Sequence, residues 1–121
     1  MIERSFFSGF TFPVSRIGLG FGLGGVFHPT RQLAQFESAL MRGLELGFNL
    51  VDTAQNYAGG QSETALGAAL EGRETPYLLA TKVGPHNFDK HLFREAISAS
   101  LKRLRSPSID LLYLHWPNPA V

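Results

Sequence analysis

The sequence predicts an α/β fold in which parallel strands alternate with helices. Apolar strand segments at residues 48–52, 77–82 and 109–115 each follow a stretch whose apolar residues recur at helical steps of three and four. A shorter buried strand, residues 16–20, is predicted ahead of the first helix. Because a parallel partner is reached only through a crossover connection, the order βαβαβαβ indicates one parallel sheet with right-handed crossovers.

A small hairpin is predicted ahead of this sheet, in residues 1–15. Two aromatic-rich runs, residues 2–7 and 10–14, flank the turn dipeptide Ser8-Gly9. Residues 16–121 then supply the strands and helices of the sheet. Since 121 residues leave little room for two domains, we expect both parts to belong to one.

Helix boundaries are predicted from capping and terminating residues. A side chain that accepts the first backbone N–H groups is expected at the start of each helix. These caps are Thr30, Ser62 and Asp89. Each helix is expected to end near a residue that reverses the chain or forbids its continuation, and these residues are Gly47, Gly72 and Pro107. The core-facing residues predicted for the third helix are Phe93, Ile97, Leu101 and Leu104.

The composition excludes several classes of protein. Apolar residues make up 44% and charged residues 17%, which provides a core and argues against disorder. A formal charge of +1 lacks the basic excess that nucleic-acid binding requires. The absence of cysteine removes disulfide scaffolds, thiolate metal sites and cysteine nucleophiles. Without a signal peptide or an apolar window of about 18 residues, we expect a soluble, cytoplasmic protein that does not contact membranes.

Four ionisable side chains fall at the predicted carboxyl ends of the strands. Asp52, Lys82 and His115 end the second, third and fourth strands, and Tyr57 follows Asp52 by five residues in the adjoining loop. Open parallel sheets and (β/α)8 barrels both place ligands at this edge. A lysine at the end of an apolar strand pays a desolvation cost unless it is paired, and Asp52 on the neighbouring strand is the predicted partner.

Together these groups predict a site for the reduction of a carbonyl. An ammonium near a phenol favours the phenolate, so Lys82 would make Tyr57 a better proton donor. Asp52 would hold Lys82 through a charge-assisted hydrogen bond, and His115 would donate to the carbonyl oxygen. Because none of the four is a redox group, the hydride would come from an external donor such as a nicotinamide.

The motifs that contain these residues, together with two helical segments between them, resemble those of the aldo-keto reductases. They are Asp52–Tyr57, Gly60–Gly67, Ala80–Gly84, Ser100–Leu104 and Ile109–Pro117. The resemblance covers nearly the whole chain. It implies the first half of a (β/α)8 TIM barrel, through the fourth strand, and an oxidoreductase that uses NAD(P)H to reduce aldehydes or ketones to alcohols.

The resemblance also implies residue roles. Asp52, Tyr57, Lys82 and His115 match the family's catalytic tetrad, with Tyr57 as the proton donor and NADPH, or else NAD, as the cofactor. The cofactor-binding positions are Gly20, Phe21 and Asp52, although many members carry a polar residue where this chain has Phe21. The positions that line the substrate pocket are Phe27, His28 and Trp116. No metal is implied.

Half a barrel implies an incomplete protein. The C-terminal half, which carries further cofactor contacts in the family, is absent from these 121 residues. We therefore expect a truncated copy with weak or no activity on small-molecule carbonyl or alcohol substrates. Its uncovered sheet face and unpaired strand edges predict self-association.

Other sequence features bear on alternative functions. The segment Gly20–Gly25 satisfies G-x-G-x-x-G, but the next helix cannot begin until about Thr30, whereas a Rossmann fingerprint opens its helix directly. The four histidines lack the HxH or HExxH spacing of a metal hydrolase. A non-catalytic binding or regulatory relative of the reductases stays open as the alternative.

Overall fold

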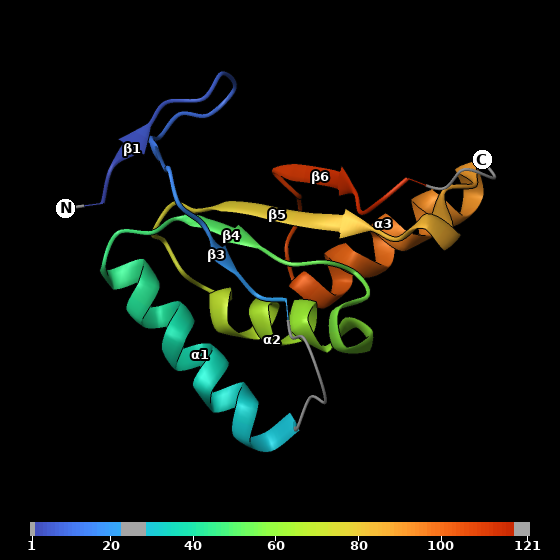
Figure 1. The fold of residues 1–121 in the computed structure, drawn as a ribbon, viewed down its shortest axis with the longest axis horizontal. Helices are drawn as coiled ribbons and strands as arrows, with labels where there is room; N and C mark the ends of the chain where they lie inside the picture. The colour runs from blue at the N-terminus through green and yellow to red at the C-terminus, as the bar shows by residue number, and fades with distance from the viewer. Residues whose placement is uncertain (1, 23–28, 118–121) are drawn as a thin grey trace.

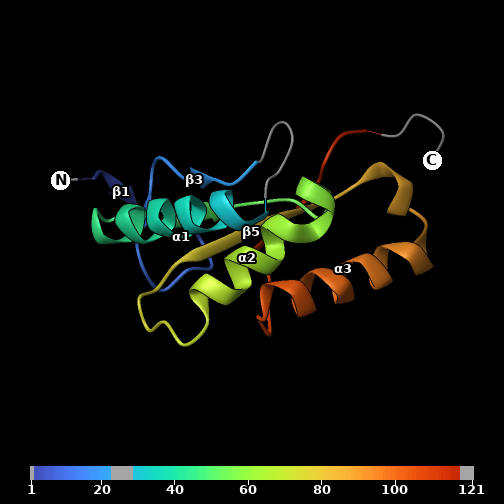
Figure 2. The same cartoon turned by 90° about the horizontal axis from the view of Figure 1, so that it is seen from below.

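Across residues 2–22 and 29–117, which the computed structural model describes, three helices cover one face of a sheet of four parallel strands (Figure 1 and Figure 2). For residues 29–33 only the backbone is described. The strands are β3 (Leu19–Gly20), β4 (Leu50–Asp52), β5 (Leu78–Val83) and β6 (Leu111–Leu114), in that order across the sheet. The helices are α1 (Pro29–Glu45), α2 (Gln61–Leu70) and α3 (Lys90–Leu104), with short 3₁₀ turns η1 (Tyr57–Gly60) and η2 (Pro85–Asn87). The predicted order βαβαβαβ is confirmed.

The predicted N-terminal hairpin is present, with shorter strands than expected. Strand β1 (Arg4–Ser5) pairs antiparallel with β2 (Val14–Ser15). Gly9 adopts a positive φ of 92° in the connecting turn, a conformation that glycine adopts without strain. The hairpin lies near the beginnings of the parallel strands (Figure 1).

Asn49 fixes the hairpin to the sheet. Its buried side chain accepts a hydrogen bond from the backbone N–H of Ser15 at 2.7 Å and donates to the carbonyl of Pro13 at 3.0 Å. Val14 is buried against Leu78 and Ala80. The hairpin therefore packs on the sheet face that the helices leave uncovered.

Successive strand residues point to opposite faces of the sheet, as a period of two requires. Val51 and Leu79 pack with the helices in the main core, whereas Leu78 and Ala80 belong to the cluster under the hairpin. Lys82 shares the parity of Leu78 and Ala80, and its ammonium meets Asp52 on the same face. The face without helices therefore carries the polar side chains at its carboxyl end.

The helix starts agree only in part with the predicted caps. Asp89 is the N-cap of α3, where its carboxylate accepts backbone N–H groups of the first turn. Helix α1 begins at Pro29, one residue before Thr30, because the fixed φ of proline suits a first helical position. The N-cap of α2 is Gly60 with φ 91°, so the prediction of Ser62 as the cap was wrong. The Ser62 side chain is buried and bonded to other segments.

Close packing of α3 on α2 explains another difference from the predicted core. The buried residues of α3 are Ala96, Ser100 and Leu104, while Phe93, Ile97 and Leu101 are only partly buried. A Cβ atom at Gly67 of α2 would collide with the backbone of α3 at Arg103 and Leu104. Small side chains are needed where two helix backbones come this close.

Strand β3 is shorter and more exposed than the buried strand predicted at residues 16–20. Leu19 is partly buried, Gly20 is exposed, and the side chain of Ile17 is 68% exposed. Strand β3 stands at the end of the sheet, and within residues 2–22 and 29–117 no strand pairs with its outer edge. None of the described helices is long and apolar enough to cross a membrane.

Candidate active site

An ion pair between two strand ends forms the centre of the candidate site. Asp52 ends β4 and pairs across the ladder with Ala80, so Lys82 lies two residues further along β5 on the same face. Lys82 Nζ donates to Asp52 Oδ2 and to the backbone carbonyl of Thr53, both at 2.6 Å. The Lys82 side chain is only 16% exposed. The carboxylate and the carbonyl together offset the cost of desolvating the ammonium.

The loop after β4 brings Tyr57 to this ion pair. The backbone N–H of Gln55 donates to the carbonyl of Lys82 at 3.1 Å, which keeps the loop against β5. Turn η1 begins at Tyr57, and the Lys82 ammonium lies 5.1 Å from the centroid of the phenol ring. This distance falls within the range of a cation–π contact. The phenol and the ammonium are therefore on the same side of the sheet.

His115 completes the group on the opposite side of Lys82 from β4. Its backbone N–H donates to the carbonyl of Val83 at 2.9 Å, so the β5–β6 ladder continues to the site. The imidazole meets the ring of Tyr57 edge-on, with 5.4 Å between centroids and an interplanar angle of 76°. Among the described residues its buried Nδ1 atom has no hydrogen-bond partner.

Burial and charge favour the neutral imidazole. Desolvation by burial lowers the pKa of His115, and the nearby Lys82 ammonium lowers it further, while the Asp52 carboxylate opposes both. A neutral imidazole presents one N–H donor and one acceptor nitrogen. His115 can therefore exchange hydrogen bonds with a ligand without adding a second positive charge beside Lys82.

Gly20 and Phe21, which were predicted to bind the cofactor, differ in their exposure. Gly20 is exposed, and a Cβ atom built there would meet nothing within 4 Å. The Phe21 side chain instead turns into the helix-side core, where its ring packs 4.3 Å from that of Phe36. The backbone N–H of Phe21 donates to the carbonyl of Asp52 at 2.8 Å, and its carbonyl accepts from Ser62 Oγ at 2.8 Å. Gly22 comes close to the phenol, since its Cβ would lie 3.6 Å from the Tyr57 hydroxyl.

The positions predicted to line a substrate pocket are described only in part. Trp116 is 45% exposed, and its ring centroid lies 4.2 Å from that of His115. Phe27 and His28 lie outside the described residues. Within the part of the chain that the structure describes, no group of three or more His, Cys, Asp or Glu side chains could hold a metal ion.

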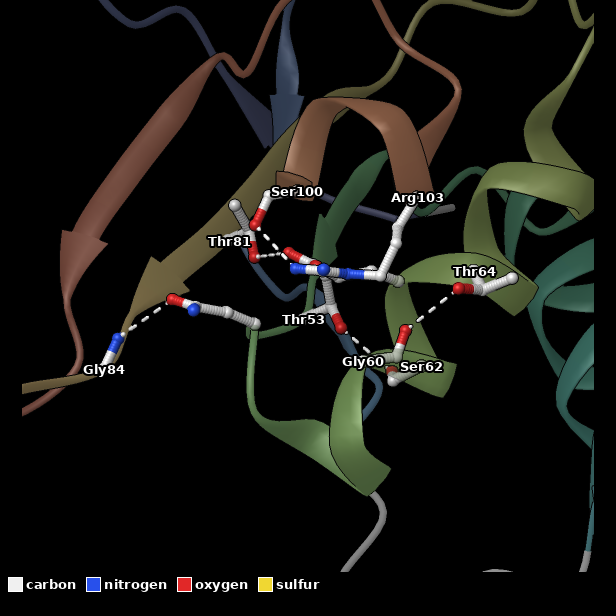
Figure 3. Close-up of polar contacts among 10 residues, drawn as sticks. Thr53, Gly60, Ser62, Thr64, Thr81, Gly84, Ser100 and Arg103 are labelled. Carbon is white, nitrogen blue, oxygen red and sulfur yellow. Dashed lines mark hydrogen bonds and ion pairs between the residues drawn. The ribbon is translucent and has the colours of Figure 1, made fainter. Parts of the chain in front are cut away.

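The sequence pattern did not predict a group of buried polar residues that joins the strand ends to α2 and α3 (Figure 3). Thr53 Oγ1 and Ser62 Oγ are 2.9 Å apart, and Thr81 Oγ1 donates to Glu63 Oε1 at 2.7 Å. Glu63 is fully buried and forms an ion pair with Arg103 of α3, at 2.7 Å. The available signal was a glutamate in a helix that otherwise buries Leu66 and Ala69, since a buried carboxylate requires a partner.

This combination defines a class of protein. Parallel strands with helical crossovers and ionisable side chains at the strand ends are the arrangement of an α/β enzyme whose site lies at the carboxyl edge of the sheet. Residues 17–121 match the model of the aldo/keto reductase family. The chain belongs to the aldo-keto reductase family.

Individual relatives agree with this assignment. The Bacillus subtilis aldo-keto reductase YhdN is 38% identical over 119 residues, a match that covers 88% of this chain and 36% of that protein. Among solved structures, the thermostable aldo-keto reductase Tm1743 aligns with a TM-score of 0.85 at 27% identity, covering 99% of this chain and 45% of that one. A Klebsiella pneumoniae aldo/keto reductase, solved with NADP and acetate, gives a TM-score of 0.80 at 34% identity over 88% and 37% of the two chains. The chain thus spans less than half the length of these relatives.

The structural neighbours are aldo-keto reductase barrels, and this chain corresponds to part of them. The predicted α/β fold is therefore confirmed, and the family supports an oxidoreductase function.

Proposed function

We propose that this chain carries the proton-donating side of a site that reduces aldehydes or ketones to alcohols with NAD(P)H. The observation that supports this most strongly is the geometry around Lys82. Its ammonium is held at 2.6 Å by Asp52 and lies 5.1 Å from the ring of Tyr57. His115, directly after β6, donates its backbone N–H to the carbonyl of Val83, the residue after Lys82. A phenol beside a fixed ammonium is suited to donate a proton to a nascent alkoxide.

Each side chain has a role in this proposal. Tyr57 gives its proton to the substrate oxygen, and the Lys82 ammonium stabilises the phenolate that remains. Asp52 keeps Lys82 in position through the charge-assisted hydrogen bond. His115 fixes the carbonyl oxygen near the phenol through its Nε2 atom, because its Nδ1 atom is buried.

The cofactor is proposed to be NADPH, and a nicotinamide bound here would supply the hydride. The positions proposed to hold it are Gly20, Phe21 and Asp52. Phe21 would act by shaping the loop, because both of its backbone polar groups are already bonded. Gly20 is open enough for a ligand to approach its backbone. The Klebsiella pneumoniae relative, solved with NADP, supports the choice of cofactor.

The substrate is proposed to be a small carbonyl compound or the matching alcohol. Trp116 is half exposed beside His115, so its ring would form an apolar wall next to the reacting oxygen. Phe27 and His28 are proposed to line the same pocket, by resemblance to the family.

Residues 1–121 are proposed to form the N-terminal half of the barrel, with the hairpin in residues 1–15 and the first strands in 16–121. On their own, these residues are expected to reduce carbonyls weakly or not at all, because they span less than half the length of the relatives. We also propose that the isolated chain self-associates. The exposed apolar side chains Ile17 and Leu114 lie at or beside the two outer strands of the described sheet.

The test is the substitution Tyr57→Phe in a full-length barrel that contains these 121 residues. Removing the hydroxyl should lower kcat for a simple aldehyde by about 10²-fold or more while leaving NADPH affinity nearly unchanged. Tyr77→Phe is the matched control, since Tyr77 precedes β5 at the opposite end of the sheet and packs against the core. Its activity should equal that of the parent.

Two results would contradict the proposal. Equal turnover by the parent and by Tyr57→Phe would show that the phenol is not the proton donor. Absence of reduction and of NADPH binding in the parent would favour a non-catalytic binding or regulatory relative.

A further inference from the structure

We propose that Ser62 and Glu63, in the first turn of α2, are positioning residues that hold Asp52 and Lys82 in place from behind the sheet. The inference rests on the proposed function, because it concerns the same ion pair. Neither residue contacts the ion pair itself. Each bonds instead to the residue next in sequence to one of its members, Ser62 to Thr53 and Glu63 to Thr81 (Figure 3).

Ser62 acts through Thr53 and Phe21. Its hydroxyl donates to the carbonyl of Phe21 at 2.8 Å and lies 2.9 Å from Thr53 Oγ1. Because a hydroxyl has one proton, the bond between the two hydroxyls must have Thr53 as its donor. The carbonyl of Thr53 is in turn a direct partner of the Lys82 ammonium, at 2.6 Å. A shift of Thr53 would therefore move a group that holds Lys82.

The same hydroxyl ties the loop after β3 to the site. Both backbone polar groups of Phe21 are bonded, since its N–H donates to the carbonyl of Asp52 at 2.8 Å and its carbonyl accepts from Ser62. Gly20 and Phe21 are the residues proposed to hold the cofactor. Ser62 thus connects the cofactor loop with the strand that carries Asp52.

Glu63 acts through Thr81. Its Oε1 atom accepts from Thr81 Oγ1 at 2.7 Å, one residue before Lys82 on β5. Its Oε2 atom accepts from Arg103 of α3, through Nε at 2.8 Å. Glu63, Thr81 and Ser62 are all fully buried. Such contacts cannot adapt by exchanging partners with water, so they fix the relative positions of β4 and β5.

Another hydroxyl in the same turn provides a control. Thr64 donates to the carbonyl of Gly60 at 3.1 Å, so this bond stays within the start of its own helix. Thr64 is exposed. Replacing it by valine makes the same chemical change as Thr53→Val without disturbing either strand.

The experiment follows the imidazole of His115 by NMR through a pH titration of the 121-residue chain, with His115→Asn used to assign the signal. The ionisable side chains that face His115 are Lys82, Asp52 and Tyr57. Loosening the ion pair admits water and weakens the influence of Lys82. We therefore expect the titration midpoint to rise toward the ordinary value of 6.5 in Thr53→Val and in Ser62→Ala.

Conservative variants separate positioning from folding. Thr53→Ser keeps the hydroxyl, so its titration midpoint should equal that of the parent. Thr64→Val should also leave the midpoint unchanged. If Thr53→Val fails to fold, the His115 titration midpoint is compared between Ser62→Ala and Thr53→Ser. Denaturant unfolding of each variant shows whether stability changed independently of the midpoint.

An unchanged midpoint in Thr53→Val and Ser62→Ala would overturn the inference, even if both variants were less stable. A midpoint that shifts equally in Thr64→Val would also overturn it. The titration does not depend on turnover. It can therefore support the positioning role when the Tyr57→Phe assay contradicts the proposed reductase function, and the two failures remain distinguishable.

Discussion

Lys82 and Asp52 are joined by a 2.6 Å hydrogen bond between the carboxyl ends of neighbouring strands. The pair follows from the ladder register. Asp52 is opposite Ala80, so Lys82 lies two residues further along β5 on the same face. The Lys82 side chain is 16% exposed and that of Asp52 34%. Removing either partner would leave the other charge partly desolvated, which makes this contact the most sensitive point of the candidate site.

The first prediction concerns the ammonium. In a full-length barrel, Lys82→Met should reduce kcat for an aldehyde by about 10²-fold or more, because the phenolate of Tyr57 loses its stabilising charge. In the 121-residue chain the same change should raise the pKa of His115, since Lys82 lowers that pKa and the freed Asp52 carboxylate raises it. Steady-state kinetics and NMR titration measure the two effects.

Lys102→Met is the control for that prediction, since Lys102 is exposed in the last turn of α3. It removes the same charge at a position remote from the strand ends. If the pKa of His115 fell or stayed constant in Lys82→Met, Lys82 would not be the charged group that most lowers this pKa.

The second prediction concerns the dependence of stability on pH. Burial lowers the pKa of His115 below its ordinary value of 6.5, so between these two values the unfolded chain binds more protons at this residue than the folded chain. The free energy of unfolding should therefore fall as the pH falls from 6.5 to the folded pKa. Above about pH 7 this residue should make no pH-dependent contribution.

Chemical denaturation at a series of pH values measures this component. His115→Asn should remove it, whereas His86→Asn, at an exposed position in η2, should retain it. A stability that rose on acidification through the same window, and did so only with His115 present, would have the wrong sign for a partly buried neutral imidazole.

The sequence was most informative where local pattern and chemistry coincide. Asp52, Lys82 and His115 could be placed at one edge because each lies at or next to the end of an apolar strand, and parallel strands bring their carboxyl ends together. Asp89 could be identified as a cap because its contacts are made within the next helical turn. The cap depends only on residues that are close in sequence. The grouping of the three side chains depends only on the fact that parallel strands end at the same edge of a sheet.

The remaining differences depend on contacts between distant segments. Ser62 resembles an N-cap in sequence, but Gly60 with its positive φ takes that position and leaves the hydroxyl to bond Thr53 and Phe21. The burial of Ser100 in place of Leu101 follows from the approach of α3 to Gly67. No local pattern specifies either contact, because both depend on how two crossovers pack together.

The third prediction compares a buried ion pair with an exposed one. Glu63→Gln leaves Arg103 without its carboxylate, and breaking a buried pair in this way costs up to about 3–5 kcal/mol; the 28% exposure of Arg103 should place the loss at or below the lower end. Glu71→Gln removes the exposed partner of Arg105 and should cost no more than about 1 kcal/mol. Equal losses in urea unfolding would show that the buried pair does not stabilise the α2–α3 contact.

The fourth prediction concerns self-association of the isolated chain. Strand β6 stands at the end of the described sheet, and its Leu114 side chain is 62% exposed. Burying a leucine contributes about 1.5–3 kcal/mol, so Leu114→Lys should weaken association by about tenfold or more in sedimentation velocity. Leu92→Lys, on the exposed side of α3, should leave association unchanged. A parent chain that sediments as a monomer at all concentrations, or equal weakening by both variants, would show that the edge of β6 is not the contact surface.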